Sequence, residues 1–365
     1  MIFRIKQAAA VAFAVIFGSV VLMMSHNVRQ GVSDSIDLCV SSVVPSLFLF
    51  TVIANFMINI GLCEALSRPV HRFSEFVFNL SGEEFCIFLL SLVSGYPVGA
   101  TLLSKRLRLQ KMSSRRAEEM LRFCISAGPA FLLISVGEMA LGHRSDGYRL
   151  LFAHTLSSVF LCFFYGLLNR FKKHDLTNIT VPQPALSPKQ TLAENFVTAA
   201  IDASKAMLNV CTFVIVFGAV GRLITTDSTP VSPFFTNLLR GIIEVTNGVQ
   251  LFGRGRLTLI AFLLGFGGIS IHFQVISILS PMKCRYFPLL LSRLAHGGLS
   301  ALIIAVMEVV SPRYIDTLAQ GTVKMSQNGN PLAVFSLILL GVVLTVYSST
   351  ALSKPPKFDI SCQNK

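Results

Sequence analysis

Glycine and proline interrupt two long apolar stretches of this chain near their centres. Residues 89–103 read LLSLVSGYPVGATLL, and residues 261–279 read AFLLGFGGISIHFQVISIL. Inside a bilayer, backbone that leaves helical geometry must be buried in protein or must line a wet cavity. Paired breaks at matching places in two halves of a chain are typical of a transporter binding site. The sequence therefore predicts a polytopic carrier.

The composition is that of a membrane protein. Hydrophobic residues make up 53% of the 365 residues, charged residues make up 13%, and mean hydropathy is +0.66, whereas a soluble domain carries roughly 25% charged residues. A helix needs about 20 apolar residues to cross a hydrocarbon core of about 30 Å. The stretches that meet this need are 8–24, 38–60, 85–103, 120–139, 148–168, 207–224, 257–279, 287–310 and 332–351. We expect an all-α polytopic membrane protein with about nine transmembrane helices plus re-entrant or broken segments.

The chain reads as two structurally related halves. Ile36-Asp37 and Ile201-Asp202 begin similar acid-capped apolar segments, and Ser94-Gly95 corresponds to Gly267-Gly268 farther along. The separations, 165 and 173 residues, differ by no more than a short loop insertion. Between the halves lies a polar, proline-containing segment that is typical of a linker. Whether the copies are inverted or parallel depends on the number of crossings between them.

Positive charge is spread through short loops rather than along one face. The formal net charge of +13 therefore does not indicate nucleic-acid binding, because Lys and Arg in short loops chiefly set membrane orientation. The densest basic loops place the C-terminus in the cytoplasm. Nine simple crossings then place the N-terminus outside, against the preference of Arg4 and Lys6. An extra crossing within residues 61–84 would remove this conflict, so the side of the N-terminus stays open.

Enzyme, cofactor and metal signatures are missing from the sequence. None of the eight cysteines forms a C-x-x-C pair, and most sit in or beside apolar spans as small hydrophobes. There is no H-E-x-x-H, G-x-S-x-G or Walker motif. We expect no catalytic activity, no cofactor and no metal. Uphill transport would then draw on an ion gradient, a solute gradient or a separate ATPase.

The first break, SGYPVGA, is the strongest candidate for a solute site. Proline removes a backbone donor and clashes with the preceding turn, while glycine leaves helical geometry at little cost. The resulting half-helix N-terminus attracts a carboxylate or phosphate. The alternative is a kinked helix that packs through its small residues, but the recurrence of glycine in the second stretch favours a site. The residues assigned from the breaks are Ser94, Gly95, Tyr96, Pro97, Gly99, Ser126, Gly128, Pro129, Gly267 and Gly268.

Polar residues alternate in the second stretch. The spacing of Ser270, His272 and Gln274 favours an unwound, extended segment whose alternate side chains face one way. Polar groups at this depth usually face a cavity. His272 could bind solute or relay a proton, or it could be a neutral histidine bonded to a neighbouring carbonyl.

Three further polar residues lie in RGIIEVTNGVQ, a segment too short and polar to span freely. It reads as a re-entrant segment whose Glu244, Thr246 and Asn247 reach the solute, or as an interfacial helix with an Arg240–Glu244 surface pair. Arg293 could serve as a counter-charge for an anionic solute or could extend its side chain to the interface.

Four motifs occur in the order seen in YlbJ-type sporulation integral membrane proteins, which carry the nucleoside-recognition, or Gate, domain. They are SGYPVGA, FCISAGPAF, GIIEVTNG and GFGGISIHFQV, and the resemblance covers most of the chain. The chain departs from the family's pattern at residues 125–127, where asparagine is more usual, and at Thr101, where lysine is frequent.

The resemblance implies a substrate-binding core like that of concentrative nucleoside transporters. It predicts an N-terminal helix at 1–30, Gate-like repeats at 31–170 and 195–310, a cytoplasmic linker at 171–194, and a last helix and tail at 311–365. It implies alternating-access transport of a small planar, anionic or nucleoside-like solute, dipicolinate by family likeness, across the cell or forespore membrane during sporulation. The alternative is a non-transporting scaffold or signalling component. The expected partners are the solute and the lipid bilayer, with homo-oligomerisation left open.

Overall fold

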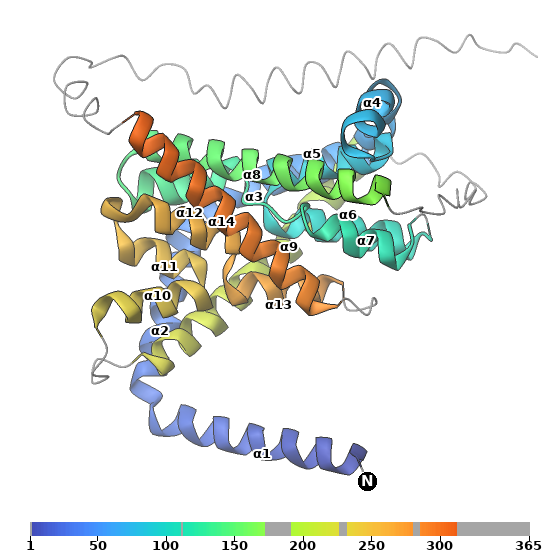
Figure 1. The fold of residues 1–365 in the computed structure, drawn as a ribbon. Helices are drawn as coiled ribbons and strands as arrows, with labels where there is room; N and C mark the ends of the chain where they lie inside the picture. The colour runs from blue at the N-terminus through green and yellow to red at the C-terminus, as the bar shows by residue number, and fades with distance from the viewer. Residues whose placement is uncertain (1, 111, 172–190, 226–231, 280–284, 312–365) are drawn as a thin grey trace, which may run out of the picture.

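The computed structural model describes residues 2–110, 112–171, 191–225, 232–279 and 285–311, and every regular element within these ranges is a helix (Figure 1). The first part of the chain forms α1 (Ile2–Met23), α2 (Ser25–Leu38), the π-helix η1 (Cys39–Val43), α3 (Val44–Asn59), α4 (Leu62–Phe78), α5 (Gly82–Ser94), α6 (Tyr96–Arg108), α7 (Ser114–Leu121), the π-helix η2 (Phe131–Ala140) and α8 (Arg144–Phe171). The second part forms α9 (Leu192–Ile224), α10 (Pro233–Ile243), α11 (Val245–Phe252), the 3₁₀ turn η3 (Arg254–Arg256), α12 (Leu257–Phe266), α13 (Gly268–Ile278) and α14 (Tyr286–Val310).

Five helices of the described residues are long and apolar enough to cross a membrane. They are Ser25–Asn59, Arg144–Arg170, Leu192–Ile224, Leu257–Ile278 and Tyr286–Val310. A sixth span results if α4 and α5, which meet at 85°, count as one bent crossing. The all-helical class and the presence of a broken or re-entrant pair are thus confirmed. The expected span at 332–351 and most of the expected linker lie outside the described residues.

Three of the expected spans are broken, and one of them, 257–279, divides into α12 and α13. The stretch 85–103 divides into α5 and α6, and the stretch 120–139 divides into α7, an extended segment and η2. Hydropathy alone counts each stretch as one span, because it does not detect where backbone hydrogen bonding stops. The breaks are predicted from the glycine and proline residues instead. The sharp entry into α5 is stabilised by a capping box, in which Ser81 and Glu84 exchange side-chain and backbone hydrogen bonds.

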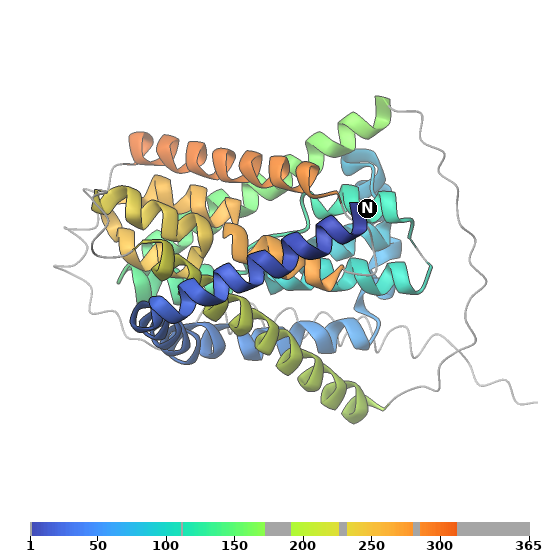
Figure 2. The same cartoon turned by 90° about the horizontal axis from the view of Figure 1, so that it is seen from below.

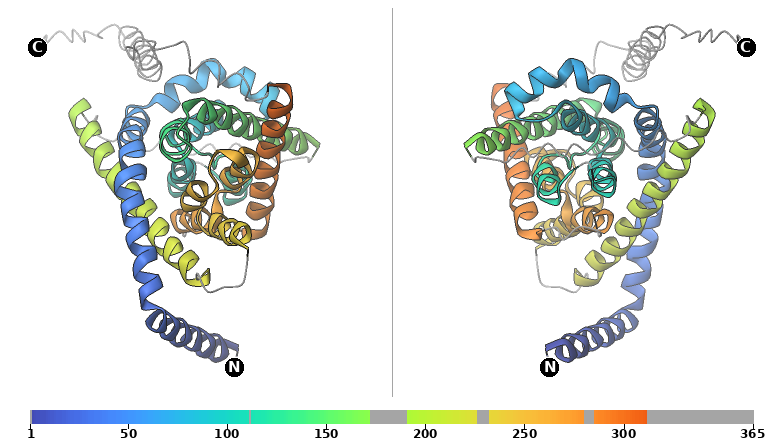
Figure 3. Two further views of the ribbon diagram at one scale, coloured as in Figure 1. Left: turned by 90° about the vertical axis from the view of Figure 1, so that its left-hand side faces the viewer. Right: turned by 90° about the vertical axis from the view of Figure 1, so that its right-hand side faces the viewer.

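The broken helices lie in the middle of the molecule, and the long helices enclose them. In the end-on views, α2–α3 crosses α9 along one side, and α14 runs along the opposite side (Figure 3). α12 packs against α14, and α8 packs against both η2 and α14. α1 projects away from this body and crosses beneath it (Figures 1 and 2). Its side chains are largely exposed, including Phe13 and Met23. Its apolar part, Gln7–Met23, is shorter than the five candidate spans, so the expected span at 8–24 is not among them.

One ion pair joins α7 to the start of α14. Arg285 donates from its backbone and its guanidinium to the carboxylate of Glu118, at distances of 2.8 to 3.2 Å. Burial opposes ionisation of Glu118, but the hydrogen bonds and charge of Arg285 outweigh it, so the pKa of Glu118 lies below its ordinary value.

The Glu118–Arg285 pair is expected to stabilise the fold fully at pH values above the ordinary carboxyl pKa of about 4.3. A lowered folded-state pKa gives stability that is present above this value and is lost as the pH falls through the folded-state pKa. The Glu118→Gln protein should therefore unfold at a lower temperature than the wild type at pH 7, and the difference should vanish in acid. Thermal unfolding in detergent across this pH range measures it, and a difference that persists in acid would contradict the assignment.

Candidate functional site

The two glycine breaks predicted from the sequence are present. Gly95 separates Ser94, the last residue of α5, from Tyr96, the first of α6, with φ 94° and ψ 179°. Gly267 and Gly268 separate α12 from α13 with φ of 88° and 68°. Residues with a Cβ rarely adopt such positive φ values, so glycine is what permits the chain to leave the helix at both places.

Two further breaks pack against these glycines. Gly128 lies in the extended segment between α7 and η2, and a Cβ added to it would sit 3.0 Å from the nitrogen of Gly95. Glu244 separates α10 from α11 in extended geometry, and a Cβ added to Gly268 would sit 3.0 Å from the nitrogen of Val245. The four breaks therefore form two close pairs. Each pair brings non-helical backbone together inside the protein, as membrane burial requires.

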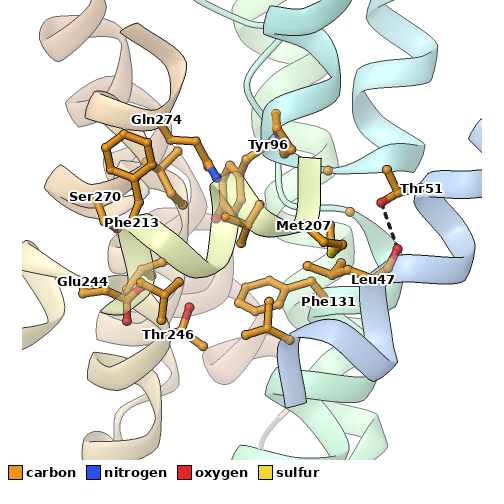
Figure 4. A pocket seen from close by; sticks show the side chains of 18 of the residues that line it. Leu47, Thr51, Tyr96, Phe131, Met207, Phe213, Glu244, Thr246, Ser270 and Gln274 are labelled. Atoms are coloured by element: carbon orange, nitrogen blue, oxygen red, sulfur yellow. Dashed lines mark hydrogen bonds between the residues drawn. The ribbon is translucent and has the colours of Figure 1, made fainter. Parts of the chain in front are cut away.

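A cavity of about 50 Å³, here called the inner cavity, lies between the two pairs. It is lined by Val43, Leu47, Thr51, Ser94, Gly95, Tyr96, Pro97, Gly128, Phe131, Met207, Val210, Phe213, Val214, Glu244, Val245, Thr246, Ser270, Ile271 and Gln274. Figure 4 shows Glu244, Thr246 and Ser270 on one side, with Leu47 and Thr51 across the cavity. The space suffices for a few water molecules.

Nine of the residues predicted for the site line this cavity. They are Ser94, Gly95, Tyr96, Pro97, Gly128, Glu244, Thr246, Ser270 and Gln274. They come from all four breaks or from the helix turns next to them. The N-terminal turns of α6, α11 and α13 all border the cavity, and helix N-termini carry partial positive charge. Ser94 adds a buried hydroxyl for which the described residues supply no hydrogen-bond partner.

Tyr96 connects the two pairs of breaks. Its hydroxyl donates to the carbonyl oxygen of Leu264, in the last turn of α12, at 2.7 Å. Its ring meets those of Phe131 and His154 edge to face, at centroid distances of 6.4 and 6.3 Å. This aromatic side chain is 8% exposed, so it forms part of the cavity wall rather than a surface anchor.

Glu244 caps α11 and is 2% exposed. Its carboxylate accepts a hydrogen bond from the backbone nitrogen of Asn247 at 2.7 Å. Arg240, in contrast, donates to the hydroxyl and carbonyl oxygens of Thr225 at 2.6 and 2.8 Å. The structure therefore agrees with the broken, inward-facing reading of this segment, and the interfacial helix with an exposed Arg240–Glu244 pair is wrong.

The prediction of an extended segment at Ser270, His272 and Gln274 is also wrong, because all three lie in α13. On a helix, residues four apart share a face, so Ser270 and Gln274 both reach the cavity while His272 points elsewhere. His272 bonds the carbonyl oxygen of Phe266 at 2.9 Å and the hydroxyl of Tyr286 at 3.1 Å. This geometry matches the alternative given for His272 in the sequence analysis, a histidine bonded to a neighbouring carbonyl rather than one that binds solute.

Arg293 is fully buried outside the inner cavity. Its guanidinium donates to the carbonyl oxygens of Ile125 and Arg122, the latter at 2.7 Å, and lies 3.1 Å from a ring nitrogen of His296. It thus supplies hydrogen-bond donors to the segment that follows α7, where helical donors are missing. A contact with solute stays a prediction for this residue.

The remaining predicted residues surround the cavity without lining it. Gly99 packs on the carbonyl of Cys124, and Ser126 accepts from Ser158 at 3.4 Å. Asn247 lines a second cavity. The residues with no place in the inner wall are Gly99, Ser126, Pro129, Asn247, Gly267, Gly268, His272 and Arg293.

Sequence reasoning missed the apolar side of the cavity. α3 contributes Leu47 and Thr51, and α9 contributes Met207 and Phe213. The aliphatic and aromatic side chains resemble most of the other residues of these spans. Only Thr51 is polar, and its hydroxyl is used by the carbonyl of Leu47 at 2.8 Å, so the sequence carries no chemical signal for this wall.

The chain is similar to the sporulation integral membrane protein YlbJ of Bacillus subtilis (strain 168). The two are 27% identical over 305 residues, which cover 73% of this chain and 74% of YlbJ. This chain is a homologue of YlbJ. No family model matches it, and no solved structure matches it. Similarity to YlbJ over most of both chains, together with five candidate spans, identifies an integral multi-pass membrane protein.

Proposed function

We propose that this protein is a secondary transporter or facilitator for a small planar solute, either anionic or nucleoside-like. The observation that carries the proposal is the meeting of four helix breaks at one internal cavity. Broken helices facing a cavity are the arrangement that transporters use to hold a solute at mid-membrane. A scaffold would need no such opening, and unbroken helices would bury the same apolar surface at lower cost in unpaired backbone.

The lining favours a solute that is flat and partly apolar. Phe131, Phe213 and Tyr96 provide aromatic surface, while Thr246, Ser270 and Gln274 provide hydrogen-bonding groups. Ligand pockets combine a mainly apolar wall with a few polar groups in this way. The helix N-termini that border the cavity favour negative charge on the solute. By likeness to the YlbJ type, dipicolinate is the first candidate, and the setting is sporulation.

Solute entry requires the cavity to enlarge. Pockets for small molecules usually measure about 300–1,000 Å³, far above the 50 Å³ present here. We take this small cavity as the closed form of an alternating-access cycle, in which movement of α9 or of the broken pairs opens the site to one side.

We take the chain to consist of two related halves of four parts each. The long span of α2–α3 corresponds to α9, the pair α5–α6 to α10–α11, the segment α7–η2 to α12–α13, and α8 to α14. This order supports a duplication and matches Gly95 with Glu244 and Gly128 with Gly267, rather than Gly95 with Gly267. The two expected crossings outside these parts are α1 and the stretch 332–351, of which the latter lies outside the described residues.

Purified protein in proteoliposomes is expected to take up labelled dipicolinate or one member of a nucleoside panel. The Gln274→Leu substitution should lower uptake at least about tenfold, because a lost polar contact to solute costs about 1–3 kcal/mol. Ser277→Ala, on the exposed face of the same helix, is the matched control and should transport normally. If the wild-type protein moves none of these solutes, or if both variants transport equally, the proposal is wrong.

A further inference from the structure

Glu244 lies between two cavities. A second, larger cavity of about 400 Å³, here called the outer cavity, is formed by α2, η1, α9, α10 and α11. Glu244 lines both the inner and the outer cavity. Besides Glu244, four charged side chains line the outer cavity, namely Asp34, Asp37, Arg222 and Arg240. Glu244 is the one charged residue of the inner cavity among the described residues. This carboxylate therefore stands where a polar space meets a mainly apolar one.

No basic side chain of the described residues forms an ion pair with Glu244. Its carboxylate accepts a hydrogen bond from the backbone nitrogen of Asn247, and the side chains of Thr246 and Ser270 lie beside it. These are neutral partners. An ionised carboxylate that is buried without a counter-charge is costly, and acidic residues inside membrane proteins are usually paired or functional. The negative charge of Glu244 is therefore not balanced within the described residues, and a cation from solution could balance it.

The basic residues nearest to this point have other partners. Arg240 donates to Thr225 at 2.6 and 2.8 Å, and Arg222 donates to the side-chain oxygen of Gln30 at 3.3 Å. The acidic residues Asp34 and Asp37 of α2 face the same outer cavity, where they raise the local concentration of cations. The other titratable groups that face Glu244 are Cys39 of η1 and Tyr96 of α6.

Unpartnered hydroxyls mark both sides of the carboxylate. Ser35 in the outer cavity is 1% exposed, Ser94 in the inner cavity is 5% exposed, and neither hydroxyl has a hydrogen-bond partner among the described residues. Buried polar groups are nearly always satisfied. The hydroxyls of Ser35 and Ser94 are therefore available to bind water or a hydrated ion that passes from one cavity to the other.

An ionised Glu244 would also disfavour binding of an anionic solute in the inner cavity. The N-terminal turns of α6, α11 and α13 favour an anion in the inner cavity, yet the carboxylate that caps α11 places a negative charge in the same space. An anion and an ionised Glu244 would repel each other strongly at low dielectric. We propose that Glu244 binds a monovalent cation, a proton or an alkali-metal ion, which enters through the outer cavity and is carried together with the solute. This inference rests on the proposed transport function.

The test uses wild-type protein and the Glu244→Gln variant in proteoliposomes. The probe is whichever labelled solute the panel above identifies, under an inward proton gradient, an inward sodium gradient or neither. One gradient is expected to raise wild-type accumulation at least about tenfold, and the cation concerned is then known. Glu244→Gln keeps the shape of the side chain and the cap of α11 but removes the negative charge, so its uptake should be the same with either gradient as without one. Glu75→Gln, on the exposed face of α4, should behave as the wild type.

Three outcomes would overturn the proposal. The first is wild-type uptake that ignores both gradients, which leaves the transport function intact. The second is a Glu244→Gln protein that responds to the gradient as the wild type does. The third is loss of uptake without a gradient in a folded Glu244→Gln protein, which would assign the carboxylate to the solute. Absence of any wild-type uptake would instead reject the transport function itself.

Discussion

The Gly99→Ala protein is expected to be strongly destabilised, by about 3 kcal/mol or more, at the upper end of the range for overpacked cores. A methyl group at this position would lie 1.9 Å from the carbonyl oxygen of Cys124. The obstructing atom belongs to the backbone, so it cannot turn aside as a side chain would. Relief requires α6 to move away from the extended segment that follows α7, and that movement would separate Gly95 from Gly128.

Thermal unfolding in detergent measures this effect. The chain has no tryptophan, but buried thiols such as Cys124 and Cys162 become reactive on unfolding and can be followed with a fluorogenic maleimide. Gly298→Ala is the matched control, because it is also inside a helix but has no atom within 4 Å of the added methyl. Alanine there should stabilise the helix by up to about 1 kcal/mol. Equal midpoints for the two variants would show that α6 does not pack as described.

Arg293→Met is expected to lower the stability by about 3 kcal/mol, because each buried acceptor that loses its donor costs about 1–3 kcal/mol. Methionine has similar length but no donors, so the carbonyl oxygens of Arg122 and Ile125 would be left buried and unpaired. The segment that contains Gly128 would then lose its fixed position beside Gly95. Unfolding midpoints in detergent measure the loss, and solute uptake in proteoliposomes shows its effect on the site.

A surface arginine serves as the control for this substitution. Arg115 is 67% exposed and lies 3.5 Å from Glu119, so Arg115→Met should cost no more than about 1 kcal/mol. A normal unfolding midpoint together with abolished uptake in the Arg293→Met protein would reverse our interpretation. It would favour the counter-charge role expected from the sequence over the structural role seen here.

The positions of the breaks could be predicted from the sequence because they have local causes. Gly95 and Gly267 occupy backbone conformations that side chains exclude, and Glu244 interrupts a segment too short to cross the membrane. Such effects depend on a few neighbouring residues. The homology to YlbJ and the membrane class likewise follow from features that are spread over the whole chain, namely ordered motifs and hydropathy.

The apolar wall of the site could not be predicted, because it depends on which face of each long helix turns inward. Met207 and Phe213 belong to a span whose other faces are equally hydrophobic. The conformation of α13 was misread for a related reason. Three polar residues at alternate positions fit an extended period, but burial requires backbone hydrogen bonds, and a helix supplies them within one segment. The placement of Arg293 depends on contacts with residues about 170 positions away, which no short sequence window contains.

The hydroxyl of Tyr96 has a mechanical consequence. It bonds the carbonyl oxygen of Leu264, three residues before the break at Gly267, so α6 cannot shift without either moving the end of α12 or breaking this bond. A displacement of α6 would therefore be transmitted to the end of α12 through this hydrogen bond, which couples the breaks at Gly95 and Gly267 mechanically.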